Sequence, residues 1–287
     1  MSMCKFSVIT VCLNAESEIE QTIRSVLNQT YPDFEYLIKD GGSQDGTVSI
    51  AQSFAPAFAQ KGIPYRVLSR RDGGVYEAMN QAACEARGEW INYMNAGDWF
   101  ADGSVLERTA QSGLLETADV VYGDRILRNG DLFRYEKAYA LEEFRFRLPF
   151  GHQSSFTRGE LLRALPFSLK YRLCSDYHFF LQLYREGRRF ACMPMAVAVY
   201  DIHGISSDWK KNHLDRLRIL EEMPVRDDEA IRWLRARLKK KERKEWLHRH
   251  FFRYIPSQLR QKRRARMNAG AGWKTAEEMF PLGKDRP

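Results

Sequence analysis

Three polar stretches hold the residues of this chain whose types and spacing could do chemistry. In "KDGGSQDGT" (39–47), Asp40 precedes two glycines, where the backbone can approach a ligand closely and a carboxylate can accept hydrogen bonds from a base imide or a ribose hydroxyl. In "SRRDGGVYEAMN" (69–80), two arginines and an acid precede a helix, and arginines and helix N-termini both favour anions such as a diphosphate. In "NYMNAGDWF" (92–100), a short apolar strand ends in an asparagine, a glycine and the carboxylate of Asp98.

Each stretch also has a plainer interpretation. Asp45 with the following Gly and Thr can simply cap a helix after a glycine turn. Arg70 and Arg71 can lie in a solvated loop. The polar residues of the third stretch can simply form the turn that follows a buried strand. The position of the stretches along the chain decides between these interpretations.

Strand and helix patterns alternate through the first 125 residues. Apolar, β-branched runs predict strands at 6–13, 34–42, 65–69, 88–94 and 118–124, and helical spacing predicts helices at 16–30, 45–58, 75–86 and 103–115. This alternation predicts an α/β domain with a mixed, mostly parallel sheet covered on both faces. Ligands of such sheets bind at the carboxyl ends of the strands, and the three polar stretches, with Asn14, all follow predicted strands.

The second half of the chain is less regular. Residues 126–175 are rich in aromatics and arginines without a long periodic helix, whereas a helix is expected from Asp176 to 187 and an extended segment at 188–204. Residues 209–254 are helix-forming with a break at Pro224. We therefore expect a catalytic or binding domain at 1–225 and a basic helical extension at 226–287, whose end is expected to be disordered.

Composition restricts the class of protein. The 287 residues are 44% hydrophobic and 13% aromatic, as in a packed globular protein. No apolar run is long enough to cross a bilayer, and the N-terminus lacks the apolar centre of a signal peptide. The five cysteines are scattered and fit neither a disulfide framework nor a zinc site, which favours a reducing cytosol.

The net charge of +8 is concentrated at the C-terminal end. From Arg226 onward, 19 Lys and Arg stand against 8 Asp and Glu, while residues 1–225 are slightly acidic. Within 231–266, dense basic residues alternate with apolar ones: Trp233, Leu234, Leu238, Trp246, Leu247, Phe251, Phe252 and Ile255. This composition predicts a helix on an anionic membrane surface. The alternatives are a solvated helix packed on its own domain and a nucleic-acid arm. The nucleic-acid arm is the weaker alternative, because the sequence of the body shows no recognition module and no basic face, so no nucleic acid is expected as a partner.

The ordered set of motifs resembles family 2 glycosyltransferases, which are inverting enzymes with the GT-A fold. The resemblance covers roughly residues 5–205 and rests on "SVITVCLN" to "IKDGGSQDGT", on "DGGVYEAMNQAACEARGEWINYMNAGDW", and on "GHQSSF" and "CSDYHFFLQL". In the general character of its sequence, the chain is most similar to enzymes that assemble bacterial capsule, O-antigen or exopolysaccharide units.

The resemblance implies a role for each matching residue on the donor side. Asp98 matches the metal-binding carboxylate, but Ala96 and Gly97 stand where a preceding acid is usual, so that Asn95 would supply part of the missing donor contact as an amide. Thr10 and Asn14 match residues that line the nucleotide pocket. Asp40 matches the carboxylate that recognises the uracil ring, and Asp72 lies in the loop that faces the donor's sugar and phosphates.

On the acceptor side, the resemblance implies that Asp176 is the catalytic base. His203 stands where related enzymes sometimes have a histidine near the diphosphate or metal. The alternative is that His203 is an ordinary loop histidine. His152 and Gln153 are expected to shape the acceptor pocket.

The chemistry implied is a single displacement at an anomeric carbon. A base takes the proton of the acceptor hydroxyl, and a divalent cation, Mn²⁺ or Mg²⁺, stabilises the departing diphosphate. The expected partners are a nucleotide sugar, with UDP as its nucleotide, and a saccharide or lipid-linked acceptor at the cytoplasmic membrane's inner face. The alternatives are a non-catalytic nucleotide- or nucleic-acid-binding protein and a nucleotidyltransferase, but "VCLNAESEIE" is not the phosphate loop that a nucleotidyltransferase would need.

Overall fold

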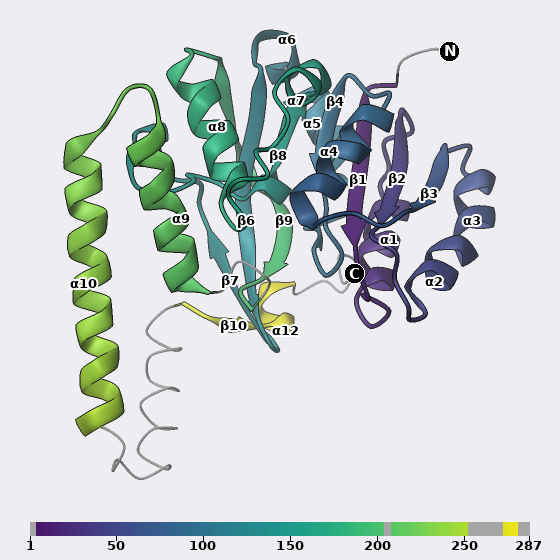
Figure 1. Cartoon of the computed structure of the whole chain (residues 1–287). Coiled ribbons are helices and arrows are strands. Elements are labelled where there is room, and N and C mark those ends of the chain that lie inside the picture. The colour runs from purple at the N-terminus through teal and green to yellow at the C-terminus, as the bar shows by residue number, and fades with distance from the viewer. Residues whose placement is uncertain (1–3, 204–207, 252–271, 281–287) are drawn as a thin grey trace.

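A single mixed sheet organises the chain in the computed structural model, which describes residues 4–203, 208–251 and 272–280 (Figure 1). The strands run in the order β10-β7-β6-β8-β4-β1-β2-β3, and β9 pairs with both β6 and β5. Their bounds are β1 Phe6–Cys12, β2 Phe34–Asp40, β3 Tyr65–Ser69, β4 Trp90–Tyr93, β5 Trp99–Phe100, β6 Val120–Asn129, β7 Leu132–Glu136, β8 Ser155–Arg158, β9 Phe190–Asp201 and β10 Lys274–Thr275.

The parallel part of the sheet is its N-terminal half. Strand β1 pairs in parallel with β2 and β4, and β2 pairs in parallel with β3, so that these four strands end at one edge. Strand β9 also runs parallel to β6, whereas β8 joins β4 and β6 antiparallel to both. The expected α/β fold with a mixed, largely parallel sheet is confirmed.

Helices cover both faces of the sheet, as alternating apolar residues in β1 require. Phe6 and Val8 face one core, and Ile9 and Val11 face the other. The first core packs against α1 (Ile19–Leu27), α2 (Thr47–Ser53), α3 (Ala55–Gln60), α5 (Val105–Gln111), α6 (Leu114–Thr117) and α12 (Ala276–Met279). The second packs against α4 (Val75–Glu85), α7 (Gly159–Ala164), α8 (Ser175–Arg185), α9 (Trp209–Glu222) and the start of α10 (Asp228–Phe251).

Two of the expected helices are each divided in two. The helix expected at 45–58 is interrupted at Phe54 between α2 and α3, because Pro56 has no N–H to continue the hydrogen-bond ladder. The helix expected at 103–115 is interrupted between α5 and α6, where Gly113 adopts a φ of +71°.

The segment 126–175, which the sequence left unassigned, completes the sheet and one side of the site. Its first part extends β6 into a hairpin with β7, followed by the short 3₁₀ helices η1 (Leu141–Arg145) and η2 (His152–Ser154). Strand β8 and α7 come next, and a short connection leads to α8. In the chain, the turn η2 therefore follows the β6–β7 hairpin and η1, and it leads directly into β8, an inner strand of the sheet.

The basic C-terminal helix begins within the folded body. Ala230, Ile231 and Leu234 of α10 are buried in the second core, and the Trp233 ring lies 4.7 Å from that of Phe146. Further along α10, the Trp246 side chain is 51% exposed. Figure 1 shows α10 beside α9 at the outer edge of the molecule. Phe252 and Ile255 of the apolar pattern lie outside the described residues.

None of the helices among the described residues is both long and apolar enough to span a bilayer.

Candidate active site

The parallel strands bring the predicted donor-side residues to one edge of the sheet. Asp40 is the last residue of β2, Asp72 follows β3, and Asn95 and Asp98 follow β4. Because β1 to β4 run in the same direction, their carboxyl ends form a single edge, as the sequence indicated.

Asp40 is fully buried, and its carboxylate holds the glycine turn that follows it. The side chain accepts hydrogen bonds from the N–H of Gly42 at 2.9 Å and from the hydroxyls of Ser43 and Ser69. Burial by itself raises the pKa of this carboxyl, but these hydrogen bonds outweigh it and hold the pKa below its usual range. Asp40 is therefore an anion that fixes the shape of the turn.

Asp72 is held by a buried lysine, Lys39. The Lys39 Nζ lies 2.7 Å from Asp72 Oδ2, and the two side chains are 2% and 6% exposed. The same Nζ donates to the carbonyl oxygens of Asp40 and Arg70, at 2.8 and 2.6 Å. This ammonium group therefore ties the loop after β3 to the end of β2.

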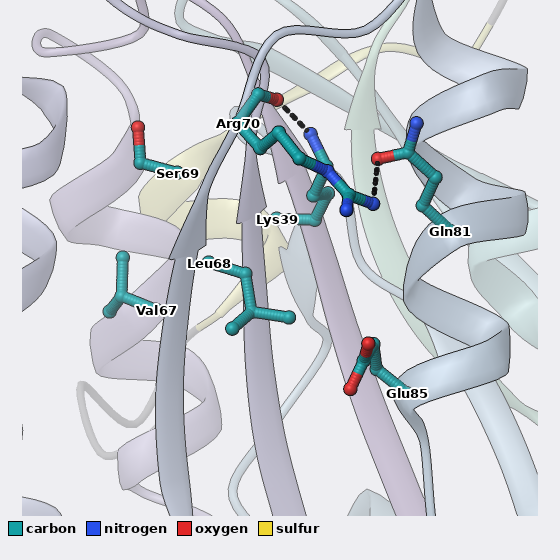
Figure 2. A pocket seen from close by; sticks show the side chains of 7 residues that line it. All are labelled: Lys39, Val67, Leu68, Ser69, Arg70, Gln81 and Glu85. Carbon is teal, nitrogen blue, oxygen red and sulfur yellow. Dashed lines mark hydrogen bonds between the residues drawn. The ribbon is translucent and has the colours of Figure 1, made fainter.

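A pocket of about 350 Å³ lies beside this lysine, between β3 and α4 (Figure 2). Arg70 crosses it to bond Gln81 on α4 at 3.0 Å. The pocket is lined by Lys39, Val67, Leu68, Ser69, Arg70, Gln81 and Glu85. Asp98 and Asp176 do not line it, so it is separate from the carboxylates predicted to act on a sugar.

We expect Asp72→Ala to destabilise the protein by about 3–5 kcal/mol, because the substitution leaves the Lys39 ammonium buried without its carboxylate. The double variant Lys39→Met/Asp72→Leu should recover most of that loss, since it removes both charges. Urea denaturation of the three proteins measures these differences. A single variant as stable as the wild type would show that Lys39 is satisfied by the two carbonyl oxygens alone.

Thr10 and Asn14, at the end of β1, occupy different environments. Thr10 is buried, and its hydroxyl donates to the carbonyl oxygen of Met94 at 2.6 Å, which ties β1 to the end of β4. Asn14 is exposed with a φ of +50°, and its side-chain oxygen accepts from the N–H of Gln44 at 2.9 Å. Asn14 is thus positioned at the surface of this edge, whereas Thr10 lies beneath it.

Asp98 is positioned by η2 and by α1. Its Oδ2 accepts from Gln153 Nε2 at 2.9 Å, and Thr22 of α1 donates to its backbone carbonyl oxygen at 2.7 Å. Burial raises the pKa of the Asp98 carboxyl to about 7; the Gln153 hydrogen bond opposes this, and the carboxylates of Glu18 and Asp201 add to it.

Gly97 lies close to Glu18 and has a backbone conformation that favours glycine. A Cβ on Gly97 would meet Glu18 Oε2 at 2.9 Å, and the glycine has a φ of +93°, which side chains disfavour. An acid at this motif position would therefore need a strained backbone and would lie next to the carboxylate of Glu18, the residue just before α1.

Asp176 lies in the first turn of α8 and receives three hydrogen bonds. Tyr76 of α4 donates its hydroxyl to Oδ1 at 3.1 Å, and the N–H of Tyr177 donates to the same oxygen at 2.8 Å. His152 Nδ1 lies 3.2 Å from Oδ2. Burial favours the neutral acid, but the bonds from His152, Tyr177 and Tyr76 outweigh it and hold the pKa of Asp176 below its usual range.

The turn η2 connects the two acidic residues. Its successive residues His152 and Gln153 contact Asp176 and Asp98 respectively, and His152 Nε2 also lies 3.1 Å from the side-chain nitrogen of Asn95. The carboxylate at the end of β4 and the carboxylate on α8 therefore belong to one continuous polar cluster.

His203 lies apart from the contacts just described. It is exposed, and its Nε2 is 2.9 Å from Asn129 Oδ1 at the end of β6. The backbone N–H of His203 donates to the side chain of Asp201, and the charge of Asp201 acts on Asp98. The connection between His203 and the site is therefore indirect, through Asp201.

Sequence reasoning overlooked four residues that support this cluster: Lys39, Tyr76, Glu18 and Asp201. Only Lys39 carried a signal, because a lysine in the apolar strand "FEYLIKD" needs a buried partner. The other three are brought in by tertiary packing from other elements.

A sheet of this strand order, covered by helices on both faces, has the GT-A fold found in nucleotide-sugar transferases. Residues 7–186 match the model of glycosyl transferase family 2. The chain belongs to this family and is a glycosyltransferase, as the sequence motifs implied.

Related proteins and solved structures are similar over most of this chain. A PGL/p-HBAD biosynthesis glycosyltransferase of Mycobacterium bovis is 33% identical over 231 residues, covering 79% of this chain and 89% of that one. The mannosyltransferase PcManGT of Pyrobaculum calidifontis, solved with GDP-Man and Mn²⁺, is 18% identical with a TM-score of 0.62, covering 83% of this chain and 70% of that one.

S. aureus TarS has the same fold. The fragment 1–349, solved with UDP, is 17% identical with a TM-score of 0.59, covering 90% of this chain and 77% of the fragment. This chain spans 44% of the longer TarS chain, with a TM-score of 0.61, 19% identity and 86% of this chain covered.

The residues around Asp98 fit a divalent cation held by oxygen. The carboxylates of Glu18 and Asp201 both act on the Asp98 carboxyl, and a cation would remove the cost of ionising Asp98. Over residues 4–203, 208–251 and 272–280, no three His, Cys, Asp or Glu side chains converge enough to hold an ion alone. Donor phosphates and water would therefore complete the coordination.

Proposed function

We propose that this glycosyltransferase moves a sugar, with inversion, from a UDP-sugar to a hydroxyl group of a saccharide or lipid-linked saccharide in cell-surface glycan synthesis. The observation that carries the proposal is η2, which links the acid at the metal position, Asp98, to the candidate base, Asp176, through Gln153 and His152. A binding scaffold would need no base, so this pairing favours catalysis over binding alone.

The proposed reaction is a single displacement. Asp176 takes the proton of the acceptor hydroxyl, the acceptor oxygen bonds to the anomeric carbon, and the nucleoside diphosphate leaves with the electron pair of the broken bond. Asp98 would hold Mn²⁺ or Mg²⁺, which when bound neutralises charge on the leaving diphosphate. We propose that His203 lies farther from the same ion and contributes to the environment of the ion or of the diphosphate.

The proposed donor pocket lies at the carboxyl ends of β1 to β4. Asn14 is exposed there. The buried side-chain oxygen of Asn95 has no partner within the part of the chain that the structure describes, so it can accept a hydrogen bond from a hydroxyl. Asp40 and Asp72 are held by internal bonds, so we propose that they act through the turn and the loop they hold in place. Thr10 would support this pocket from beneath.

The cell-surface role is supported by the relatives. The mycobacterial relative is named for PGL/p-HBAD biosynthesis. We propose an acceptor of the same broad class, built on a lipid or an exported saccharide.

The test is a panel of nucleotide sugars with and without Mn²⁺, read first by thermal stabilisation and then by release of the nucleoside diphosphate. Stabilisation and release with one UDP-sugar would support the proposal. Stabilisation without release or transfer to any saccharide acceptor would favour a binding protein, and pyrophosphate release from a nucleoside triphosphate would favour a nucleotidyltransferase.

We also propose that residues beyond the packed start of α10 bind an anionic membrane surface. The described part of α10 is rich in Lys and Arg and carries a half-exposed Trp246. In the chain beyond it, "QKRRAR" (261–266) adds four charges. The protein would then meet a lipid-linked acceptor at the inner face of the cytoplasmic membrane.

Replacing these four residues, Lys262, Arg263, Arg264 and Arg266, with Gln is expected to weaken binding to anionic vesicles by on the order of 10²–10³-fold at low salt, since each charge contributes about 1 kcal/mol. Sedimentation with phosphatidylglycerol-containing vesicles and with phosphatidylcholine alone measures this. Substitution is preferred to truncation at 226, which would remove the buried Ala230, Ile231 and Leu234. Equal sedimentation of both proteins would contradict membrane binding by this segment.

A further inference from the structure

His152 occupies a position between the donor and acceptor sides of the site. Its Nδ1 is 3.2 Å from Asp176 Oδ2, and its Nε2 is 3.1 Å from the side-chain nitrogen of Asn95. The His152 and Asp176 side chains are 17% and 16% exposed. The ring therefore joins the first residue of "NAGD" to the carboxylate on α8.

We propose that His152 is a positioning residue for the base: it donates its Nδ1–H to Asp176 Oδ2, and Asn95 fixes the tautomer that makes this possible. The inference rests on the proposed role of Asp176 and assigns new roles to His152 and Asn95, beyond shaping an acceptor pocket or contacting the donor.

The tautomer follows from the donors available. A side-chain amide nitrogen only donates, so Nε2 of a neutral ring must accept from Asn95. The single ring proton is then on Nδ1, which faces Asp176. Since Nδ1–H can only donate, Asp176 must accept, which requires the carboxylate form or a proton on another face of the acid. The arrangement keeps Asp176 ready to take a proton.

The other bonds to Asp176 leave one place for the incoming proton. Oδ1 accepts from both Tyr76 and the N–H of Tyr177, whereas Oδ2 accepts from His152 alone among the described residues. The groups facing the carboxyl are Tyr76 from α4, His152 from η2 and Cys174 just before α8. The free lone pair of Oδ2 is thus the site that receives the acceptor proton.

Asn95 adds a connection to the substrate. Its Nδ2 faces His152, while its Oδ1 is buried and has no partner among residues 4–203, 208–251 and 272–280. A buried amide oxygen without a hydrogen-bond partner is destabilising, and a sugar or ribose hydroxyl would satisfy it. A hydroxyl bound to Oδ1 would hold the amide, and with it the His152 tautomer, in the orientation that serves the base.

The turn that carries His152 is fixed independently of its ring. Asn92 donates its side-chain N–H groups to the carbonyl oxygens of Gln153 and Ser155, both at 2.9 Å, and Ser155 donates its hydroxyl to the carbonyl oxygen of His152 at 2.8 Å. Ring substitutions therefore leave the backbone of η2 and its contact to Asp98 in place.

The test compares His152→Asn, His152→Gln and His152→Ala in the full chain. An Asn amide nitrogen reaches the place of Nδ1, whereas a Gln amide nitrogen reaches that of Nε2. We expect His152→Ala and His152→Gln to lower kcat by about 10–100-fold, as removal of outer partners commonly does, with little change in KM for the donor. We expect His152→Asn to retain most of kcat.

The pH dependence of kcat, at saturating donor and Mn²⁺, separates positioning from a merely structural role. Loss of the Nδ1–H bond leaves burial to raise the pKa of Asp176, so the acid limb should move toward neutral pH in His152→Ala but not in His152→Asn. Histidine ¹⁵N spectra should show an Nδ1–H tautomer signal that disappears in each variant. An unchanged acid limb in His152→Ala, or equal loss in Asn and Gln variants, overturns the inference.

Asp176→Asn in the same assay distinguishes this failure from that of the proposed function. An inactive Asp176→Asn with an unshifted His152→Ala would leave Asp176 as the base and remove only His152 from its positioning role. An active Asp176→Asn would remove the base itself, and the inference with it.

Discussion

Asp176→Asn is expected to lower kcat for sugar transfer by about 10²–10⁴-fold, the usual contribution of a general base, while donor affinity stays close to that of the wild type. The amide has nearly the same shape as the carboxylate and can still accept from Tyr76 and Tyr177. What it loses is the ability to take the acceptor proton and to accept from His152, because the amide nitrogen takes the place of Oδ2. The measurement is kcat together with donor affinity by calorimetry.

Asp131→Asn is the matched control, since this exposed carboxyl in the turn between β6 and β7 lies outside the described site contacts. It should leave both quantities unchanged. Near-normal turnover in Asp176→Asn, with the fold intact by circular dichroism, would exclude Asp176 as the base.

Asp98→Ala is expected to weaken Mn²⁺-dependent donor binding by about 10–100-fold, as loss of one charged contact costs about 1.5–3 kcal/mol. The variant also removes the acceptor of the Gln153 side chain, so Asp98→Asn is made beside it to keep that contact. Both should lose the stabilisation that a UDP-sugar gives in Mn²⁺, measured as the shift in melting temperature.

Chelation provides the independent comparison. Wild-type protein in EDTA should bind donor as weakly as Asp98→Ala does in Mn²⁺, and the variant should respond little to the chelator. Donor binding that is indifferent to both EDTA and substitution of Asp98 would mean that the divalent-metal mechanism does not operate in this enzyme.

The parallel half of the fold was predictable because its signals are local. Each of β1 to β4 is an apolar run followed by glycine or a polar turn, and each helix between them has its own apolar face. The start of α8 at Ser175 was equally readable from "DYHFFLQLYREG". The divided helices were not, since Pro56 and Gly113 act through backbone geometry that periodicity does not report.

The segment from the end of β6 to η2 could not be read because its structure depends on distant partners. Strand β8 exists because it pairs with β4 and β6, and η2 is held by the side chain of Asn92. The same reason explains why only part of the site was predictable. Asp98 and Asp176 were predicted from their motif positions, but Tyr76 and Glu18 come close to them only through the packing of α4 and α1.

The place of β8 has a consequence for the order in which the chain can fold. Strand β4 pairs on one side with β1 and on the other with β8, which follows it by more than sixty residues. A growing chain that has released β1 to β4 therefore presents an open strand edge until residues 155–158 emerge, and open edges invite pairing with other chains. The donor-side and acceptor-side halves share one sheet across this seam. They cannot be exchanged between relatives as independent modules unless β4 and β8 are transferred together.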